Sequence, residues 1–431
     1  MERKIYKKLL CWKNSEDRKP LILQGARQVG KTYIVNLFAS REYANSVYCN
    51  FEKDGGLREL FADLTPEGIV KRLSIYKRRE IIKEKTLIIF DEVQACPEAL
   101  TSLKYFNEEA NCYHIIALGS LLGVSVNRES FSFPVGKVQL MTMYPLDFEE
   151  YLMALGEEAL IGMIRDCYGE GRPLEAPFHR RALEYYKEYL FVGGMPEAVA
   201  EYQKNRSPEL VRVIQSTILE SYHNDMGKYN KQSEIPKTRL VYKSIGTQLA
   251  KENKKFQYKD IKTGGRASVF EEAIEWICLS GIAAQVYRLE QIMLPLPAYR
   301  SLSDFKFYMN DVGLCGACQD IYYEDVLGDN PLLDNFKGGL TENYVFNQLI
   351  ASGFLPYYWT NGTQAEVDFI VRVGEDIIPI EVKAKENTRA RSLGIYTERY
   401  HPKYAIRVSQ KNFGIENGIR SVPLYAVFCI V

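Results

Sequence analysis

The sequence lacks the features that mark secreted, membrane-bound and low-complexity proteins. No apolar run among its 431 residues approaches the length that spans a bilayer, and the basic start MERKIYKKLLCWKN has no apolar signal-peptide core. It contains no repeat and no compositionally biased tract. These absences indicate a cytoplasmic chain with no membrane partner, and its length predicts more than one globular domain.

Metal-binding patterns of cysteine and histidine, and disulfide patterns, are also missing. The nine cysteines are scattered and odd in number, which is typical of reduced thiols, and the four histidines show no ligand spacing. The formal net charge is zero, so the whole chain predicts no polyanionic partner. Residues 226–266, however, hold eleven Lys and Arg against three Asp and Glu. Such a run is more often a solvated face than a nucleic-acid track, and both interpretations stay open.

The first motif that carries chemistry is PLILQGARQVGKTYIVN, residues 20–36. An apolar strand leads into G-x-x-x-x-G-K-T and then into a helical pattern, which is the spelling and the context of a phosphate-binding loop. The glycines let successive N–H groups surround a phosphate, and the helix adds the positive end of its dipole. Lys31 can reach the β- and γ-phosphates of ATP, and the Thr32 hydroxyl is placed to ligate Mg²⁺. The predicted nucleotide-binding residues are Gly25, Ala26, Arg27, Gln28, Val29, Gly30, Lys31 and Thr32.

The second motif is KTLIIFDEVQ, residues 85–94. An apolar strand that ends in two acids is typical of a parallel strand buried on both faces, with its carboxyl end at the ligand crevice. Asp91 would hold Mg²⁺ through water, and Glu92 would orient or deprotonate the attacking water. A glycine-rich turn alone occurs by chance, but the two motifs in this order predict an ATPase that uses Mg²⁺.

Apolar segments at 45–51, 114–120 and 137–146 predict the remaining strands of the sheet. Ser120 lies just beyond the end of one of them. It resembles the polar sensor residue that reads the γ-phosphate in AAA-type ATPases. A serine in this position is equally well suited to cap a following helix.

Five segments occur in order: LILQGARQVGKT, LIIFDEVQ, IIALGS, YPLDFEEYL and FVGGMPEAV. They resemble a widespread prokaryotic family of AAA-type ATP-binding proteins, over essentially the whole chain. The resemblance implies an α/β fold of the P-loop NTPase class, with a parallel sheet in the order 5-1-4-3-2. Members often have Gly-Arg after the sensor strand, where this chain has Gly136-Lys137. Lysine lacks the planar fork of arginine, so Lys137 is a poor replacement for a trans-acting arginine finger.

The middle of the chain has helical patterns. The pattern after YPLDFEEYLMALG is interrupted at Gly193-Gly194, and we expect a helical lid over residues 151–205. Residues 206–300 show helix, short connection, helix and a β-like segment, and resemble the winged helix that the family is expected to carry. Three glutamates between 271 and 275 make the candidate recognition helix acidic. This charge favours a structural or protein-contact role over reading DNA.

Near the end of the chain, IPIEVKAK places Glu381 and Lys383 on one face of an apolar strand. The alternating segment QAEVDFIVRV, residues 364–373, precedes it, and a short turn would join the two as a hairpin. Asp368 then lies on the same face as Glu381 and Lys383. Charged groups on one face of an apolar strand pair predict a polar site rather than ordinary core.

An aspartate followed by E-x-K resembles the core of the PD-(D/E)xK nuclease fold. The resemblance implies that Asp368 and Glu381 bind Mg²⁺ and that Lys383 positions the attacking water. The fold also takes a carboxylate from a preceding helix, and Glu342 shares a helical stripe with three apolar residues. Alternatively, the four residues form ion pairs in a domain that no longer cuts, since fold does not fix function.

The combined prediction is Mg²⁺-dependent ATP hydrolysis, coupled to a nuclease-like domain that cleaves or binds DNA or RNA. The alternative is a switch ATPase whose C-terminal domain docks a protein partner. The expected domains are the ATPase core at 1–150, the helical lid at 151–205, the winged helix at 206–300 and the nuclease-like domain at 301–431. Neither the identity of a partner nor the oligomeric state follows from the sequence.

Overall fold

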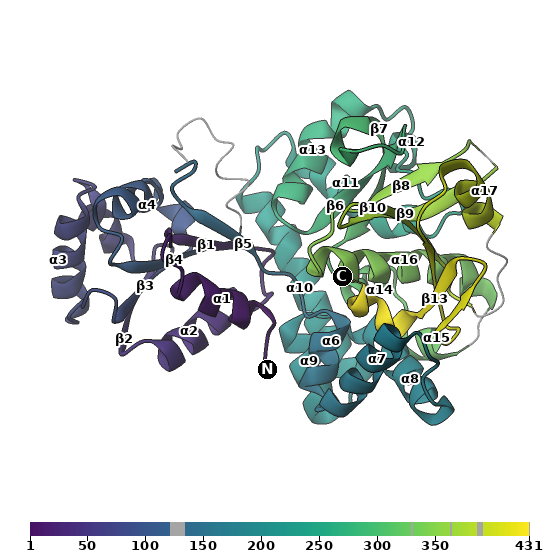
Figure 1. Cartoon of the computed structure of the whole chain (residues 1–431). Helices are drawn as coiled ribbons and strands as arrows, with labels where there is room; N and C mark the ends of the chain where they lie inside the picture. The colour runs from purple at the N-terminus through teal and green to yellow at the C-terminus, as the bar shows by residue number, and fades with distance from the viewer. Residues whose placement is uncertain (121–133, 329–330, 363, 386–390, 431) are drawn as a thin grey trace. The chain divides into compact units, whose positions relative to one another are not determined.

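The chain folds into two compact units (Figure 1). The computed structural model describes residues 1–120, 134–328, 331–362, 364–385 and 391–430. The N-terminal unit comprises Glu2–Tyr144 with Leu279–Ile282, and the C-terminal unit comprises Pro145–Cys278 with Ala283–Val431. Among the helices of the described ranges, none combines the length and apolarity needed to cross a membrane. The three domains expected after residue 150 fall within the C-terminal unit, except for Leu279–Ile282.

A five-stranded parallel sheet in the order β2-β3-β4-β1-β5 forms the centre of the N-terminal unit. Its strands are β1 (Leu21–Gln24), β2 (Asn45–Asn50), β3 (Thr86–Asp91), β4 (His114–Gly119) and β5 (Gln139–Thr142). The α/β class and the strand order predicted from the resemblance are thereby confirmed. Every residue of β3 and β4 is buried, as expected for parallel strands covered on both faces.

Helices flank this sheet and supply its core. They are α1 (Ile5–Lys13), α2 (Lys31–Glu42), α3 (Pro66–Lys77) and α4 (Pro97–Glu109), with 3-10 segments at Gly55–Phe61 and Val93–Ala95. The rings of Phe51, Phe61 and Phe90 meet edge to face, with centroids 5.4 to 5.6 Å apart, in the core that α3 and α4 share with β2 and β3. This packing fixes the end of β3, where the predicted acidic motif begins.

The C-terminal unit starts with helices. They are α6 (Phe148–Ala154), α7 (Glu158–Glu170), α8 (Ala176–Val192), α9 (Pro196–Asn205), α10 (Pro208–Lys228), α11 (Ile235–Leu249), α12 (Tyr258–Ile261) and α13 (Ala267–Leu279). The helices expected as a lid over the nucleotide pack on later parts of this unit. The hydroxyls of Tyr186 on α8 and Thr341 on α16 (Asp334–Ala351), for example, lie 3.3 Å apart.

A mixed eight-stranded sheet follows in the order β12-β13-β11-β10-β9-β8-β6-β7. Its strands are β6 (Ala283–Leu289), β7 (Arg300–Met309), β8 (Tyr357–Thr360), β9 (Glu366–Val373), β10 (Asp376–Val382), β11 (Ala405–Ser409), β12 (Gly414–Glu416) and β13 (Ile419–Pro423). The connections hold α14 (Val312–Ala317), α15 (Tyr323–Leu327), α16 and α17 (Arg391–Tyr400), with 3-10 segments at Leu296–Tyr299, Pro331–Leu333 and Leu424–Cys429.

Strands β6 and β7 form an antiparallel hairpin where the sequence predicts the wing of a winged helix. This hairpin continues into the C-terminal sheet, because Arg288 of β6 pairs in parallel with Tyr358 of β8. The domain boundary expected at residue 300 therefore falls inside one sheet. A wing and an edge hairpin have the same local alternation, so only the long-range pairing distinguishes them.

The glycine pair in FVGGMPEAV allows a close approach of three segments. Leu146 N donates to Gly194 O at 2.7 Å, and Gly194 N donates to Asp311 Oδ2 at 2.6 Å. A Cβ on Gly194 would lie 2.0 Å from Leu146 O. Asp311 also caps α14 by accepting from Leu314 N at 2.8 Å, and burial raises its pKa to about 6. The pair thus has a packing role in the C-terminal unit.

Replacing Gly194 with alanine should lower the free energy of unfolding by roughly 1–3 kcal/mol, because the added methyl group overpacks against a backbone carbonyl. Urea denaturation followed by tryptophan fluorescence measures the effect. Gly162→Ala on α7 is the control: nothing lies within 4 Å of its Cβ, and a helical alanine should add about 0.5–1 kcal/mol. Equal stability of the two variants would contradict the packing role.

Candidate functional sites

The predicted phosphate loop connects β1 to α2. Gly25 has φ +147°, and a Cβ there would lie 2.2 Å from Met143 O, so only glycine fits. Gly30 caps α2 with φ +93°, a left-handed conformation that glycine adopts without strain. Ala26 and Val29 are buried and hold the loop against the unit. The backbone N–H groups at the start of α2 are those expected to meet a phosphate.

Lys31 is buried in this loop. Its Nζ donates to Gly25 O at 2.8 Å and to Ala26 O at 2.7 Å. Burial lowers its pKa to about 8, although the charges of Glu92 and Asp91 oppose the shift. A buried ammonium whose hydrogen bonds go to neutral carbonyls is well prepared to receive the negative charge of a phosphate.

The first acid of the second motif lies beside the loop. Thr32 Oγ1 donates to Asp91 Oδ2 at 3.4 Å, which brings together the two residues predicted to hold Mg²⁺. The same Oδ2 accepts from the Tyr48 hydroxyl and from Asn50 Nδ2, the latter at 3.3 Å. A hydroxyl and a carboxylate oxygen are hard ligands of the kind that Mg²⁺ prefers, so the residues fit the ion. Tyr48 and Asn50 were not predicted, because β2 carries no recognised motif.

Glu92 and Ser120 occupy the ends of neighbouring strands. Glu92 has φ +52°, and its Oε2 accepts from Gln94 Nε2 at 2.5 Å. Ser120 is buried, and its Oγ has no hydrogen-bond partner among the described residues. The helix that Ser120 would cap in the alternative interpretation lies outside the described residues. Lys137, which stands where the resembled family often has arginine, pairs with Glu108 of α4 at 3.0 Å.

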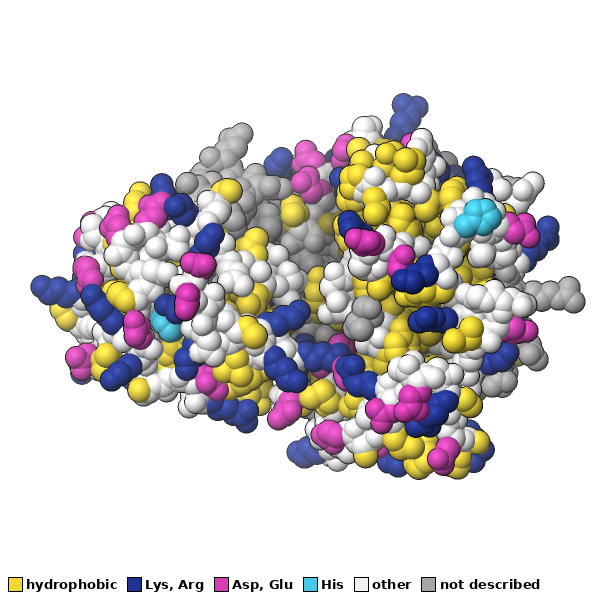
Figure 2. All heavy atoms as spheres, in the orientation of Figure 1, with side chains coloured by type: hydrophobic (Ala, Val, Ile, Leu, Met, Phe, Trp, Pro, Cys, Tyr) yellow, Lys and Arg dark blue, Asp and Glu magenta, His cyan; other side chains and the backbone are white. Residues whose placement is uncertain are grey.

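At least five of the eleven basic residues in the run 226–266 form ion pairs with acids. Its ion pairs include Lys231–Glu272, Lys237–Glu234, Lys251–Asp260, Lys254–Glu342 and Lys255–Asp304. On the face shown in Figure 2, Lys and Arg side chains lie among Asp and Glu side chains. These contacts favour the solvated, ion-paired face over a nucleic-acid track.

The four predicted C-terminal residues converge in one cluster. Strands β9 and β10 form the expected hairpin, and Val382 N donates to Asp368 Oδ2 at 2.8 Å. Lys383 Nζ lies 2.9 Å from Glu381 Oε1. Glu342 of α16 reaches the same cluster, because Lys306 bridges it to Asp368. All three carboxylates are buried.

Sequence reasoning missed the two lysines that complete this cluster. Lys306 of β7 is fully buried, with its Nζ 3.4 Å from Glu342 Oε2 and 3.6 Å from Asp368 Oδ1. Lys254 pairs with the other oxygen of Glu342. The only local signal for Lys306 is a lysine inside the aromatic run FKFYM, and Lys254 has none beyond the basic run.

The buried charges shift one another's pKa values in opposite directions. Burial opposes the charge of Lys306, but the carboxylates of Glu342, Glu366 and Asp368 outweigh it and raise the lysine's pKa. Burial likewise opposes the charge of Glu342, and Lys254 and Lys306 more than compensate, so its pKa is lowered. Burial and the negative charge of Glu342 raise the pKa of Asp368. The lysines therefore stabilise Glu342 more than Asp368.

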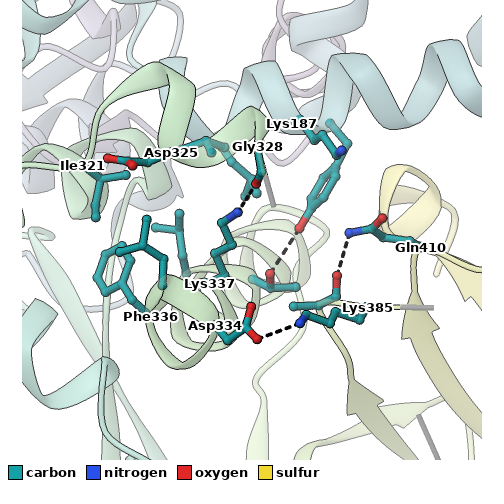
Figure 3. Close-up of a pocket in the computed structure, with 16 residues that line it drawn as sticks. Lys187, Ile321, Asp325, Gly328, Asp334, Phe336, Lys337, Lys385 and Gln410 are labelled. Atoms are coloured by element: carbon teal, nitrogen blue, oxygen red, sulfur yellow. Dashed lines mark hydrogen bonds and ion pairs between the residues drawn. The ribbon is translucent and has the colours of Figure 1, made fainter. Parts of the chain in front are cut away.

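A small pocket of about 60 Å³ lies next to the cluster, between α8, α15, α16 and the end of the EVKAK segment (Figure 3). Two of its basic side chains are engaged: Lys385 pairs with Asp334 at 2.6 Å, and Lys337 donates to Gly328 O. The pocket has room for only a few water molecules, and we assign it no ligand.

Glu342→Gln should lower the free energy of unfolding of the C-terminal unit by about 3–5 kcal/mol, because it removes the counter-charge from buried lysines. Asp376→Asn is the control. It breaks the exposed pair with Lys403, 3.0 Å apart, and should cost less than about 1 kcal/mol. Urea denaturation of both variants makes the comparison, and a Glu342→Gln cost as small as the control's would show that the cluster is not a buried ion network.

Comparison with known proteins matches three parts of the chain to domain families. A family described as an AAA domain matches residues 17–152, and two families described as domains of unknown function match residues 183–325 and 337–427. No curated protein matches the sequence.

Similar solved structures include a Walker-type ATPase of Pyrococcus abyssi, at 17% identity over 74% of this chain and 95% of that one, with a TM-score of 0.42. The ORC1 protein of Aeropyrum pernix in complex with DNA matches at 14% identity over 74% and 91%, with a TM-score of 0.26. Both TM-scores are below 0.5, too low to transfer any property of those two proteins to this chain. The family match and the geometry of the phosphate loop show that the chain contains an AAA-type P-loop ATPase domain at residues 17–152.

Proposed function

We propose that the protein binds ATP at the loop Gly25–Thr32 and hydrolyses it with Mg²⁺. The observation that carries the proposal is the convergence of a buried Lys31, Thr32 and Asp91 at the carboxyl edge of the parallel sheet. Loop N–H groups would bind the phosphates, and Lys31 would exchange its carbonyl partners for phosphate oxygens. Bound Mg²⁺ would neutralise phosphate charge, held by Thr32 directly and by Asp91 through water.

The remaining residues have roles in the hydrolytic step. Glu92 would orient or deprotonate the attacking water, and its contact with Gln94 orients the carboxylate before nucleotide arrives. Ser120, whose hydroxyl has no hydrogen-bond partner among the described residues, would read the γ-phosphate. The nine free cysteines agree with a reducing compartment such as the cytoplasm.

Lys31→Ala should lose detectable nucleotide binding in a fluorescent-nucleotide assay, because the loop loses its only buried positive charge.

Glu92→Gln should still bind ATP, but its turnover should fall roughly 100-fold or more, the usual cost of removing a general base. The exposed Lys71 and Glu109 offer matched controls, Lys71→Ala and Glu109→Gln, which should match the wild type. Retained binding in Lys31→Ala would refute the loop assignment, and unchanged turnover in Glu92→Gln would remove Glu92 from the mechanism.

ATP binding should be accompanied by proton uptake at about pH 8.5, because the pKa of Lys31 is about 8 in the free protein and phosphates raise it. Near pH 6.5, Lys31 is already protonated and this uptake should vanish. Calorimetry in two buffers with different ionisation enthalpies measures the protons taken up. A Lys31→Arg variant that still binds should show none from this residue, and equal uptake at both pH values would contradict the assignment.

The second candidate function concerns the C-terminal unit, and it is supported by the convergence of Glu342, Asp368, Glu381 and Lys383. These four residues are the ones that the nuclease resemblance implies. A nuclease-like site built from them would either cleave or bind DNA or RNA. The lysines in the same cluster argue against cutting. They leave the alternative, a switch ATPase whose C-terminal domain docks a protein partner. We adopt this alternative.

A further inference from the structure

The cluster around Glu342 is arranged about an ammonium group. Lys306 lies in β7 between aromatic residues and is fully buried. Its Nζ is within 4 Å of carboxylate oxygens of three residues: Glu342 at 3.4 Å, Glu366 at 2.5 Å and Asp368 at 3.6 Å. These carboxylates come from α16 and β9. Bridging carboxylates from separate elements is the task that a divalent cation performs in a metal site.

Most of the oxygens that a metal would need already have partners. Both oxygens of Glu342 are engaged, one by Lys254 and the other by Lys306 and the Tyr308 hydroxyl at 3.0 Å. One oxygen of Asp368 accepts from the backbone at 2.8 Å, and the other faces Lys306. Lys383 holds one oxygen of Glu381.

The residues present do not fit a Mg²⁺ ion. Mg²⁺ requires near-octahedral oxygen ligands, and within this cluster only Glu381 Oε2 is a buried carboxylate oxygen without a hydrogen-bond partner. In the described ranges, no group of three or more His, Cys, Asp or Glu side chains is placed to hold a metal. The charges also argue against a bound Mg²⁺ ion, because three ammonium groups already face the four carboxylates.

We propose that the Lys306 ammonium takes the place of a divalent cation in this cluster. The C-terminal unit then keeps the residues of a nuclease-like site but binds no Mg²⁺ or Mn²⁺ at Asp368 and Glu381, and does not cut nucleic acid by a metal-dependent reaction. Lysine suits this role because it is a compact charge with three donors, each able to meet a different carboxylate. This inference is independent of ATP hydrolysis in the N-terminal unit.

The test is a Mn²⁺ titration of the full chain without nucleotide, with bound Mn²⁺ counted by electron paramagnetic resonance. Every protein carries Asp91→Ala, so that the phosphate loop contributes no metal site. The parent should bind no Mn²⁺ above background. Lys306→Met keeps the length of the side chain and removes the charge, so it should gain one Mn²⁺ per chain. Adding Asp368→Ala to that variant should remove the gained site.

Lys385→Met is the matched control, because Lys385 pairs with an acid outside the cluster and its loss should create no site. Lys306→Gln, with a polar tip, serves if the methionine variant does not fold. A Mn²⁺ site in the parent that Asp368→Ala abolishes would overturn the proposal, as would Mg²⁺-dependent plasmid cleavage lost with Asp368→Ala. Folded Lys306 variants that gain no site would show that the lysine is not what excludes the metal.

Discussion

A buried charge has to be met by an opposite charge or by hydrogen bonds, and this constraint governs both sites of the protein. Lys31 donates hydrogen bonds to neutral carbonyl oxygens, which do not offset the cost of burying its charge. Burial therefore lowers its pKa. Lys306 is buried even more completely, but the surrounding carboxylates raise its pKa. The first lysine has hydrogen bonds to carbonyl oxygens and only partial compensation from Glu92 and Asp91, and the phosphates of a nucleotide would supply the remaining counter-charge. The second has its counter-charges within the fold and requires nothing from outside.

The phosphate site was largely predictable because its chemistry is local. G-x-x-x-x-G-K-T spans one turn, and Gly25 and Gly30 have the unusual φ angles that the motif requires. The strand order also followed, but only through the resemblance to a family. The partners of Asp91 did not follow, since Tyr48 and Asn50 meet it through the pairing of β2 with β3, and no spacing along the chain encodes that contact.

The C-terminal unit was predictable only in part, for the same reason. The β9–β10 hairpin and the shared face of Asp368 and Glu381 follow from alternation and a short turn. The pairing of β6 with β8 does not, and this pairing joins the β6–β7 hairpin, with Lys306, to the sheet that carries the carboxylates. Sequence therefore predicted three of the four acids that converge, but neither Glu366 nor the buried lysine that bridges them.

Lys306, the lysine that the sequence did not predict, changes the function that the E-x-K pattern indicates. At the phosphate site, Thr32 and Asp91 lie 3.4 Å apart, and the nearby lysine is bonded to carbonyls rather than to either of them. At the C-terminal site, the lysines contact the carboxylates themselves, so a metal would have to displace an ammonium from a dry environment and leave that charge unpaired. The two sites contain similar residue types, but the oxygens of Asp91 are met by neutral hydroxyl, amide and backbone donors, which a cation that arrives with its ligand can replace without leaving a buried charge unpaired. In the mechanism proposed for this protein, metal chemistry is thus confined to the N-terminal unit, and the carboxylates of the C-terminal cluster have their counter-charges within the fold.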